Sequence, residues 1–326
     1  MLITRTPLRI TLGGGGTDLP SYYQEHGGMV VSAAITQHIY ISINRTFTDD
    51  YFLKYSQLER VDKPDQIEHP IVREVLRAHD VGPSVEIVST ADIPSGTGLG
   101  SSGSFTVGLL KAVHAMQRNH VSASDLGREA CEIEIERLGR TVGKQDQYIA
   151  AFGGITRFDF NPDGSVDVAP ARLSSDTVHD IEQHLLMFFT GYSRAADEVL
   201  AEQVTRSQDG DQSMIDNLHF VKDIGLRQLA ALESDDVTGF ADLMHEHWLN
   251  KKKRSSSMSN PRIDHYYDLG RNAGARGGKL VGAGAGGFLM FYAEDTRRVR
   301  AAMREEGLTE LRFGIDPAGS TMLVRE

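Results

Sequence analysis

The sequence contains a single cysteine, Cys131, among its 326 residues. One cysteine cannot form an intrachain disulfide, and cysteine-rich zinc or iron–sulfur sites are excluded as well. Long apolar runs are also missing. The most apolar late stretch, residues 280–293, is interrupted by glycines and is shorter than the ~18 residues that a membrane span needs. The N-terminal apolar run contains Arg5 and Arg9, which is not typical of a signal peptide. We therefore expect a cytoplasmic protein with no membrane partner.

Positive charge is scarce, with 34 Lys and Arg against 45 Asp and Glu and a net charge of −11. This balance argues against a nucleic-acid partner, because binding to a phosphate backbone requires many cations. A local basic cluster remains compatible with one small anion. The composition is otherwise that of an ordinary globular protein, and the length predicts about two domains.

Strands and helices are predicted along the whole chain. Strand patterns occur at residues 2–11, 28–35, 38–47, 84–89, 155–160, 184–190, 287–293 and 309–315, and helical periodicity at 70–79, 101–118, 124–139, 195–206, 212–232, 236–250, 262–275 and 295–306. Strict alternation of strand and helix is absent, which favours an α+β fold over a doubly wound sheet. A polar, turn-rich stretch at 161–177 predicts two domains, residues 1–175 and 176–326.

Glycine is the residue in excess, at 33 positions. Many of these positions fall in three clusters, at residues 13–16, 96–103 and 277–287. Clustered glycines indicate particular backbone sites rather than flexible linkers.

The central cluster lies between a predicted strand and a helix that begins near Ser101. A strand, a glycine-rich turn and a helix together present free backbone N–H groups to an anion. Hydroxyls of Ser101, Ser102 and Ser104 lie where they can cap the helix or bind Mg²⁺. A tight capped turn is the simpler interpretation, but the density of Gly and Ser favours nucleotide phosphate binding. Residues 98–103 match the Gly-x-Gly-x-x-Gly pattern of dinucleotide-binding proteins, but no strand that ends in Asp or Glu follows about 20 residues later. The Gly-Lys-Ser/Thr of a P-loop is also missing.

The two outer clusters differ in their charges. Residues 5–18 combine Arg5, Arg9, four consecutive glycines and Asp18, so two cations and a carboxylate flank an open stretch of backbone. The cluster from Lys279 to Phe288 is equally compatible with a ligand site and with close backbone packing.

At this point the sequence resembles the GHMP kinases, and the resemblance extends over essentially the whole chain. Residues 94–104 resemble the family's Pro-x-x-x-Gly-Leu-Gly-Ser-Ser ATP loop, residues 6–9 its N-terminal motif and residues 279–287 its third motif. The resemblance implies an N-terminal domain like ribosomal protein S5 domain 2, a ferredoxin-like C-terminal domain, and the use of ATP and Mg²⁺. The implied ATP-binding residues are Pro94, Gly96, Gly98, Gly100, Ser101, Ser102 and Gly103.

For Mg²⁺, the family pattern implies Ser102 and an acidic residue on the helix after the ATP loop. Glu134 stands twelve residues before Asp146, a spacing seen in galactokinases. Most acidic residues of such a run form a solvated helix face. Glu132 and Glu136, which fall on other faces of the helix, are the alternatives to Glu134.

Asp146 and Arg9 are the catalytic candidates. Asp146 lies in a segment that resembles the family's Gly-x-x-Asp-Gln, where a carboxylate acts as base or orients the acceptor hydroxyl; a helix cap is the alternative. Arg9 matches the galactokinase arginine. Its guanidinium is suited to stabilising charge and not to acting as a base.

The sugar is expected to contact the N-terminal cluster, at Arg5, Gly15, Gly16, Thr17 and Asp18. Asp18 is expected to accept hydrogen bonds from sugar hydroxyls. Gly15 and Gly16 stand where galactokinases have Glu-His. The loss of these two side chains makes galactose a doubtful substrate and leaves room for a larger sugar.

A basic run at residues 251–254 is a candidate receptor for a substrate phosphate. Its candidate residues are Lys251, Lys253 and Arg254, with Arg194 as a further candidate. A solvated helix end is the alternative interpretation. Because consecutive helical residues point apart, only one or two of them can reach a common ligand.

Within the family, residues 5–23, 142–154 and 248–264 are most similar to the D-glycero-D-manno-heptose 7-phosphate kinases. The resemblance implies transfer of the ATP γ-phosphate to O1 of the sugar phosphate, in nucleotide-activated heptose synthesis. The expected partners are ATP and a small-molecule sugar phosphate, and a homodimer is left open. A fucokinase-like pyranose 1-kinase and a non-catalytic protein that binds ATP and sugar are the alternatives.

Overall fold

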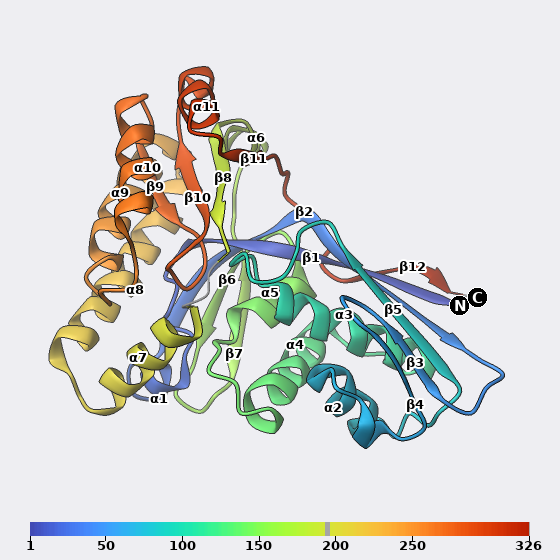
Figure 1. The fold of residues 1–326 in the computed structure, drawn as a ribbon. Coiled ribbons are helices and arrows are strands. Elements are labelled where there is room, and N and C mark those ends of the chain that lie inside the picture. Colours follow the sequence, from blue (N-terminus) through green and yellow to red (C-terminus); the bar gives the residue numbers. More distant parts are fainter. Residues whose placement is uncertain (193–195, 326) are drawn as a thin grey trace.

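The computed structural model describes residues 1–192 and 196–325, so the candidate Arg194 lies outside the described residues. Helices and strands are mixed along the chain, and they form two regions, each built on its own sheet (Figure 1). The predicted α+β class is confirmed.

The first sheet is built around one very long strand, β2 (Gly28–Arg45). Its other strands are β1 (Leu2–Gly13), β3 (Tyr51–Lys54), β4 (Leu58–Val61), β5 (Val85–Ala91), β6 (Ile155–Phe160), β7 (Val166–Pro170) and β12 (Thr321–Arg325). The pairing order is β12-β1-β2-β5-β3-β4, with β6 between β2 and β7. Strands β3 and β5 pair in parallel, and the other described pairs of this sheet are antiparallel. Residues 28–33 of β2 pair with β6 and residues 39–45 with β5. The sequence predicts two strands here, at 28–35 and 38–47, because the exposed Thr36 and the half-buried Gln37 interrupt the apolar pattern. The structure joins them into one strand whose two halves have different neighbours.

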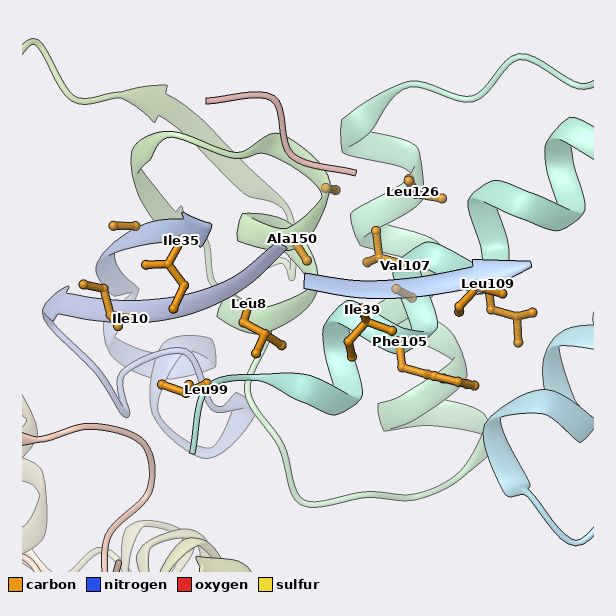
Figure 2. Packing of buried hydrophobic residues seen from close by; sticks show 14 of the residues in the cluster. Leu8, Ile10, Ile35, Ile39, Leu99, Phe105, Val107, Leu109, Leu126 and Ala150 are labelled. Atoms are coloured by element: carbon orange, nitrogen blue, oxygen red, sulfur yellow. The ribbon is translucent and has the colours of Figure 1, made fainter. Parts of the chain in front are cut away.

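Helix α3 (Ser101–Met116) forms the centre of the first region and packs on β1 and β2. Leu8, Ile39, Phe105 and Val107 belong to the core between this helix and the sheet (Figure 2). Helices α2 (Pro70–Ala78), α4 (Ala123–Cys131) and α5 (Gln145–Phe152) pack against α3. The first region also contains α1 (Pro20–His26), a 3₁₀ turn at Pro64–Gln66 and a π-helical turn at Glu132–Arg137.

The second region has a four-stranded antiparallel sheet in the order β11-β8-β10-β9. Its strands are β8 (Leu185–Gly191), β9 (Gly277–Leu280), β10 (Gly287–Tyr292) and β11 (Thr309–Leu311). Its helices are α6 (Ser175–His184), α7 (Ala196–Gln208), α8 (Gln212–Glu233), α9 (Val237–Lys251), α10 (Pro261–Asn272) and α11 (Thr296–Glu305). The buried side chains of Phe188, Trp248 and Phe291 belong to its core.

The chain crosses back to the first sheet at its end. Strand β12 pairs with β1, so that Leu2 and Arg325 lie side by side at one end of that sheet (Figure 1). Asp316 anchors the returning segment, because its carboxylate lies 2.6 Å from Nε2 of the buried His38. The division into domains at 175/176 stays a prediction. The last strand, β12, belongs to the first sheet although it lies in the predicted second domain. No helix of the described residues is both long enough and apolar enough to cross a membrane.

Candidate active site

The three glycine clusters meet at one cavity of about 220 Å³ between the two regions. Twelve of the residues predicted for the site line it: Arg9, Gly15, Gly16, Asp18, Gly96, Gly98, Gly100, Ser101, Ser102, Asp146, Lys251 and Arg254. Residues separated by more than 200 positions in the sequence therefore form one site.

The central cluster forms a loop that ends at the first residue of α3. Gly96, Gly98 and Gly100 have φ values of 78°, 82° and 76°, a left-handed conformation that favours glycine. The loop leads into the N-terminus of a 16-residue helix, where backbone N–H groups and the helix dipole favour an anion.

The central and C-terminal clusters touch through their backbones. A Cβ atom on Gly98 would lie 3.0 Å from the carbonyl oxygen of Val281, and one on Gly282 would lie 2.8 Å from Cα of Gly98. Close packing therefore explains the glycines of the third cluster, while Lys279 of the same cluster lines the cavity.

Two residues of the predicted ATP loop, Pro94 and Gly103, do not line the cavity but shape the segments around it. Pro94 is exposed, and its carbonyl oxygen accepts a hydrogen bond from Thr97 Oγ1 at 3.2 Å, which closes the turn. Gly103 is buried in α3, where a Cβ atom would lie 2.8 Å from Cβ of Asp146. A glycine at 103 thus allows α5 to bring Asp146 close to the loop.

Arg9 and Asp146 form a bidentate ion pair in the cavity. Arg9 Nε lies 2.7 Å from Asp146 Oδ1, and Arg9 Nη2 lies 2.9 Å from Oδ2. Arg9 Nη1 also donates to the carbonyl oxygen of Gly98 at 2.6 Å, and its backbone N–H donates to Leu99. The guanidinium therefore joins the loop at residues 96–102, the candidate phosphate loop, to the carboxylate of Asp146.

Ser102 and Glu134 form the second polar group. Ser102 Oγ donates a short hydrogen bond to Glu134 Oε2, and Gln147 Nε2 donates to Oε1 at 3.0 Å. Arg140 Nη1 lies 2.7 Å from Ser102 Oγ and 3.2 Å from Glu134 Oε2. A cationic group thus sits against a hydroxyl and a carboxylate, the oxygen ligands that Mg²⁺ prefers.

The π-helical turn Glu132–Arg137 explains why Glu134 is the acidic residue that reaches Ser102. Glu134 is 1% exposed, whereas Glu136 is exposed and Glu132 pairs with Arg137 at the surface. π-helical turns occur often at functional sites. Of the three alternatives that the sequence leaves open, the structure places Glu134 next to the phosphate loop.

Asp18 is buried at the cavity wall. Burial raises the pKa of its carboxyl above the usual value, and backbone N–H groups of Gln145 (3.1 Å) and Gly16 (3.2 Å) donate to it. A Cβ atom on Gly143 would overlap Asp18 Oδ2 at 1.9 Å. The glycine at 143 is therefore required for Asp18 to occupy this position.

Lys251, Arg254 and Lys279 form a buried basic cluster with His247. Lys251 Nζ donates to the carbonyl oxygens of Leu280 (3.0 Å) and Gly282 (2.6 Å), and Lys279 Nζ donates to that of Leu12 (2.9 Å). Arg254 bonds the side chains of Gln203 and Asn217 and the carbonyl oxygen of Gly15. His247 Nδ1 is buried and has no hydrogen-bond partner within residues 1–192 and 196–325.

In the described part of the chain, the three cations of this basic cluster form hydrogen bonds to neutral groups and no ion pair. Burial lowers the pKa of Lys279 to about 7 and that of Arg254 to about 10, and it lowers the pKa of Lys251 well below its usual value. Buried cations without a counterion are costly. An anionic ligand in the cavity would offset this cost.

Three predicted substrate residues do not line the cavity. Arg5 projects toward Asp316, at 3.7 Å, near the returning segment. Thr17 is fully buried, and its hydroxyl bonds the backbone of Met29. Lys253 is exposed, because its neighbours Lys251 and Arg254 occupy the inward-facing positions where α9 ends. These three expectations are corrected.

A second cavity of about 530 Å³ adjoins the first and shares Gly96, Ser101 and Ser102 with it. Its other walls come from the start of α2, the end of β5, and the side chains of Phe105 and Arg140. The phosphate loop thus lies between two spaces, as a site for two substrates requires.

Sequence reasoning missed several polar residues of the site: Arg140, Gln145, Gln147 and His247, together with the cavity position of Lys279. Arg140 and Gln147 lie within six residues of Asp146 in the sequence, and this proximity is the signal that could have indicated them. His247 and Lys279 belong to separate segments that meet only in the folded chain.

A phosphate loop, paired oxygen ligands and a carboxylate held by a guanidinium define a phosphotransferase that acts on an alcohol group. Two family models match the chain: GHMP kinases N terminal domain at residues 67–154 and GHMP kinases C terminal at residues 228–308, together about half of it. The chain belongs to the GHMP kinases, a family that uses ATP as its phosphoryl donor.

Similar proteins include heptose phosphate kinases. The chain is 29% identical over 323 residues to the D-glycero-alpha-D-manno-heptose 7-phosphate kinase of Campylobacter jejuni, and the alignment covers 94% of each chain. The structure of a D-glycero-D-manno-heptose 1-phosphate kinase from Bacteroides thetaiotaomicron superposes with a TM-score of 0.83, at 28% identity and full coverage of both chains. A bifunctional fucokinase/GDP-fucose pyrophosphorylase of Arabidopsis thaliana is 26% identical over 90% of this chain and 30% of its own length.

Proposed function

We propose that this GHMP kinase transfers the γ-phosphate of ATP to O1 of D-glycero-D-manno-heptose 7-phosphate and forms the 1,7-bisphosphate. The observation that supports it most is the buried basic cluster in the same cavity as Asp146. The names of the Campylobacter and Bacteroides relatives both describe kinases of a heptose phosphate.

In the proposed reaction the ATP phosphates lie against the loop at residues 96–102. The adenine base of ATP occupies the adjoining cavity of about 530 Å³. Asp146 orients the O1 hydroxyl and accepts its proton. The bond from O1 to the γ-phosphorus forms as the bond to the departing ADP oxygen breaks. Arg9 holds Asp146 and lies beside Gly98, so its charge stabilises the transferring phosphoryl group.

The residues present fit a Mg²⁺ ion. Ser102 and Glu134 would hold it, since their oxygens face each other and already accept hydrogen bonds from the cationic Arg140. Mg²⁺ would neutralise negative charge on the ATP phosphates. Gln147 keeps the carboxylate of Glu134 in place through Oε1, and this leaves Oε2 directed toward the loop.

The proposed receptor for the sugar's own phosphate is formed by Lys251, Arg254 and Lys279. Gly16 supports this assignment, because a Cβ atom there would lie 2.4 Å from Arg254 Nη1. Any side chain at 16 would displace the guanidinium from its position. The absence of the galactokinase Glu-His pair thus both enlarges the cavity and admits a cation.

The test is ADP release with Mg-ATP on a panel of heptose 7-phosphate, mannose 6-phosphate, mannose, fucose and galactose, followed by ³¹P NMR of the product. The proposal predicts turnover of heptose 7-phosphate and a new anomeric phosphate resonance. Turnover of fucose alone would support the fucokinase-like alternative. ATP binding without turnover of any sugar would support the non-catalytic alternative.

A further inference from the structure

Three helices outside the active site bring a carboxylate and two imidazoles together. His79 follows the last residue of α2, His114 lies in α3, and Glu129 lies in α4. Glu129 Oε1 is 2.7 Å from His79 Nε2, and Glu129 Oε2 is 2.7 Å from His114 Nε2. The candidate ligand atoms of the three residues all lie within 4.8 Å of one another.

Among the residues that the structure describes, two nitrogen atoms of this group are buried without a hydrogen bond. His79 Nε2 has none, even though it lies 2.7 Å from a carboxylate oxygen, and His114 Nδ1 has none either. The two histidine side chains are only 10% and 14% exposed. Unpartnered buried polar atoms are rare in proteins and often mark the place of an absent ion or water.

A carboxylate bridging two imidazoles by ordinary hydrogen bonds is the simpler interpretation. It accounts for the contact of His114, whose Nε2 is hydrogen-bonded to Glu129. It leaves the close contact of His79 unexplained.

We propose that His79, His114 and Glu129 bind one Zn²⁺ ion, with a water molecule as the fourth ligand. Two imidazole nitrogens and a carboxylate oxygen are a typical donor set for this cation. Tetrahedral bonds of about 2.0–2.1 Å place ligand atoms roughly 3.4 Å apart. The observed contacts of 2.7 Å thus need to widen by less than about 1 Å.

The position of this site indicates a structural role. At the other end of α2, residues 69–71 line the 530 Å³ cavity, and α3 begins with Ser101 and Ser102 of the phosphate loop. Glu129 lies five residues before Glu134. A metal at this point would link α2, α3 and α4, which carry or precede residues on the nucleotide side of the active site.

Binding of Zn²⁺ to the chelator-treated, full-length protein tests the proposal. Isothermal titration in excess Mg²⁺, which occupies the catalytic oxygen ligands, is expected to give one Zn²⁺ per chain and a higher Tm. The variants H79Q, H114Q and E129Q are each expected to weaken binding at least ~10–100-fold, the range seen when a metal's supporting groups are removed. Glutamine keeps much of each side chain's volume and hydrogen bonding.

The surface pair of His265 and Glu306, 3.3 Å apart, offers a matched control. The variant H265Q is expected to bind Zn²⁺ like the original chain. Unchanged Tm values without Zn²⁺ would show that the site variants fold. The proposal is overturned if no stoichiometric binding occurs, or if H79Q, H114Q and E129Q bind Zn²⁺ as H265Q does.

Discussion

The two sides of the candidate active site that we propose bind anions are built in opposite ways. The loop at residues 96–102 presents backbone N–H groups from glycines, and a Cβ atom on Gly96 would meet nothing within 4 Å. The basic cluster instead presents the side chains of Lys251, Arg254 and Lys279, which are 7%, 4% and 3% exposed.

The difference concerns the ligand-free state. Exposed backbone dipoles at a helix N-terminus are solvated when no anion is bound. Buried cations lose their hydration on folding, and neutral carbonyl groups replace it only in part. The loop thus suits a nucleotide that exchanges at every turnover, whereas the basic cluster strongly favours an anionic ligand over a neutral one. The proposed selection for a phosphorylated sugar rests on this contrast.

The largest expected effect falls on the residue between the two sides. Asp146→Asn removes the proton acceptor while keeping the shape of the side chain, so kcat is expected to fall ~10²–10⁴-fold. Steady-state kinetics with circular dichroism measure this. Retained turnover in a folded variant would remove Asp146 from the chemistry.

Next in size are substitutions in the basic cluster. Lys251→Met or Arg254→Met is expected to raise KM for the sugar phosphate ~10–100-fold, the effect of losing a hydrogen bond to a charged group. KM for ATP is expected to stay unchanged. Lys253→Met is the matched control, because Lys253 is exposed beside them. Equal effects of all three variants would contradict the assignment.

A smaller effect is expected at the glycines that admit Arg254. Gly16→Ala places a Cβ atom 2.4 Å from Arg254 Nη1 and forces a side chain into a φ of 99°. KM for the sugar phosphate should rise several-fold. In Gly15→Ala the nearest atom to the new Cβ is Thr11 Cγ2, at 3.2 Å. The prediction is wrong if Gly15→Ala has the larger effect.

The smallest effect concerns pH. The pKa of Lys279 is lowered to about 7 by burial, so its positive charge is lost as pH rises through 7. A sugar phosphate becomes a dianion above pH ~6. Profiles of kcat/KM for the sugar phosphate should therefore peak between these values and fall above 7. Lys279→Arg should remove the fall above pH 7, because arginine stays protonated. An unchanged profile in this variant would exclude Lys279 as the source.

The same shift predicts how the stability of the ligand-free protein depends on pH. The folded chain releases the Lys279 proton near pH 7, whereas the unfolded chain holds it until about 10.5. Between these values the unfolded state binds more protons, so the free energy of unfolding contributed by Lys279 rises with pH. Urea unfolding at pH 7 and pH 9, with Lys279→Met as reference, measures this contribution. A contribution that falls between the two pH values would contradict the direction of the shift.

Local motifs made one side of the site predictable. The loop residues, Arg9 and Asp146 belong to short segments whose residue types state their chemistry, and the structure places them together. Glu134 was predicted from its spacing to Asp146, but the π-helical turn that directs it toward Ser102 has no periodic signal in the sequence. On the other side, Lys253 was predicted along with Lys251 and Arg254, because a run of charges does not show which members face inward.

The fold was predictable to a similar degree. The α+β class follows from the order of the patterns, but β2 was divided in two because the polar Thr36 and Gln37 interrupt its apolar pattern. Helix α5, which carries Asp146, was missed because its eight residues are too short to show a helical period. The return of β12 to the first sheet depends on long-range pairing with β1 and has no local signal.

The ratio of kcat/KM for heptose 7-phosphate to that for free heptose tests the central claim most directly. The account predicts a ratio of at least ~10² in the original chain, since two or more charged hydrogen bonds are gained. Arg254→Met should reduce the ratio and Lys253→Met should leave it unchanged. A ratio near one in the original chain would contradict a phosphate receptor in this cavity.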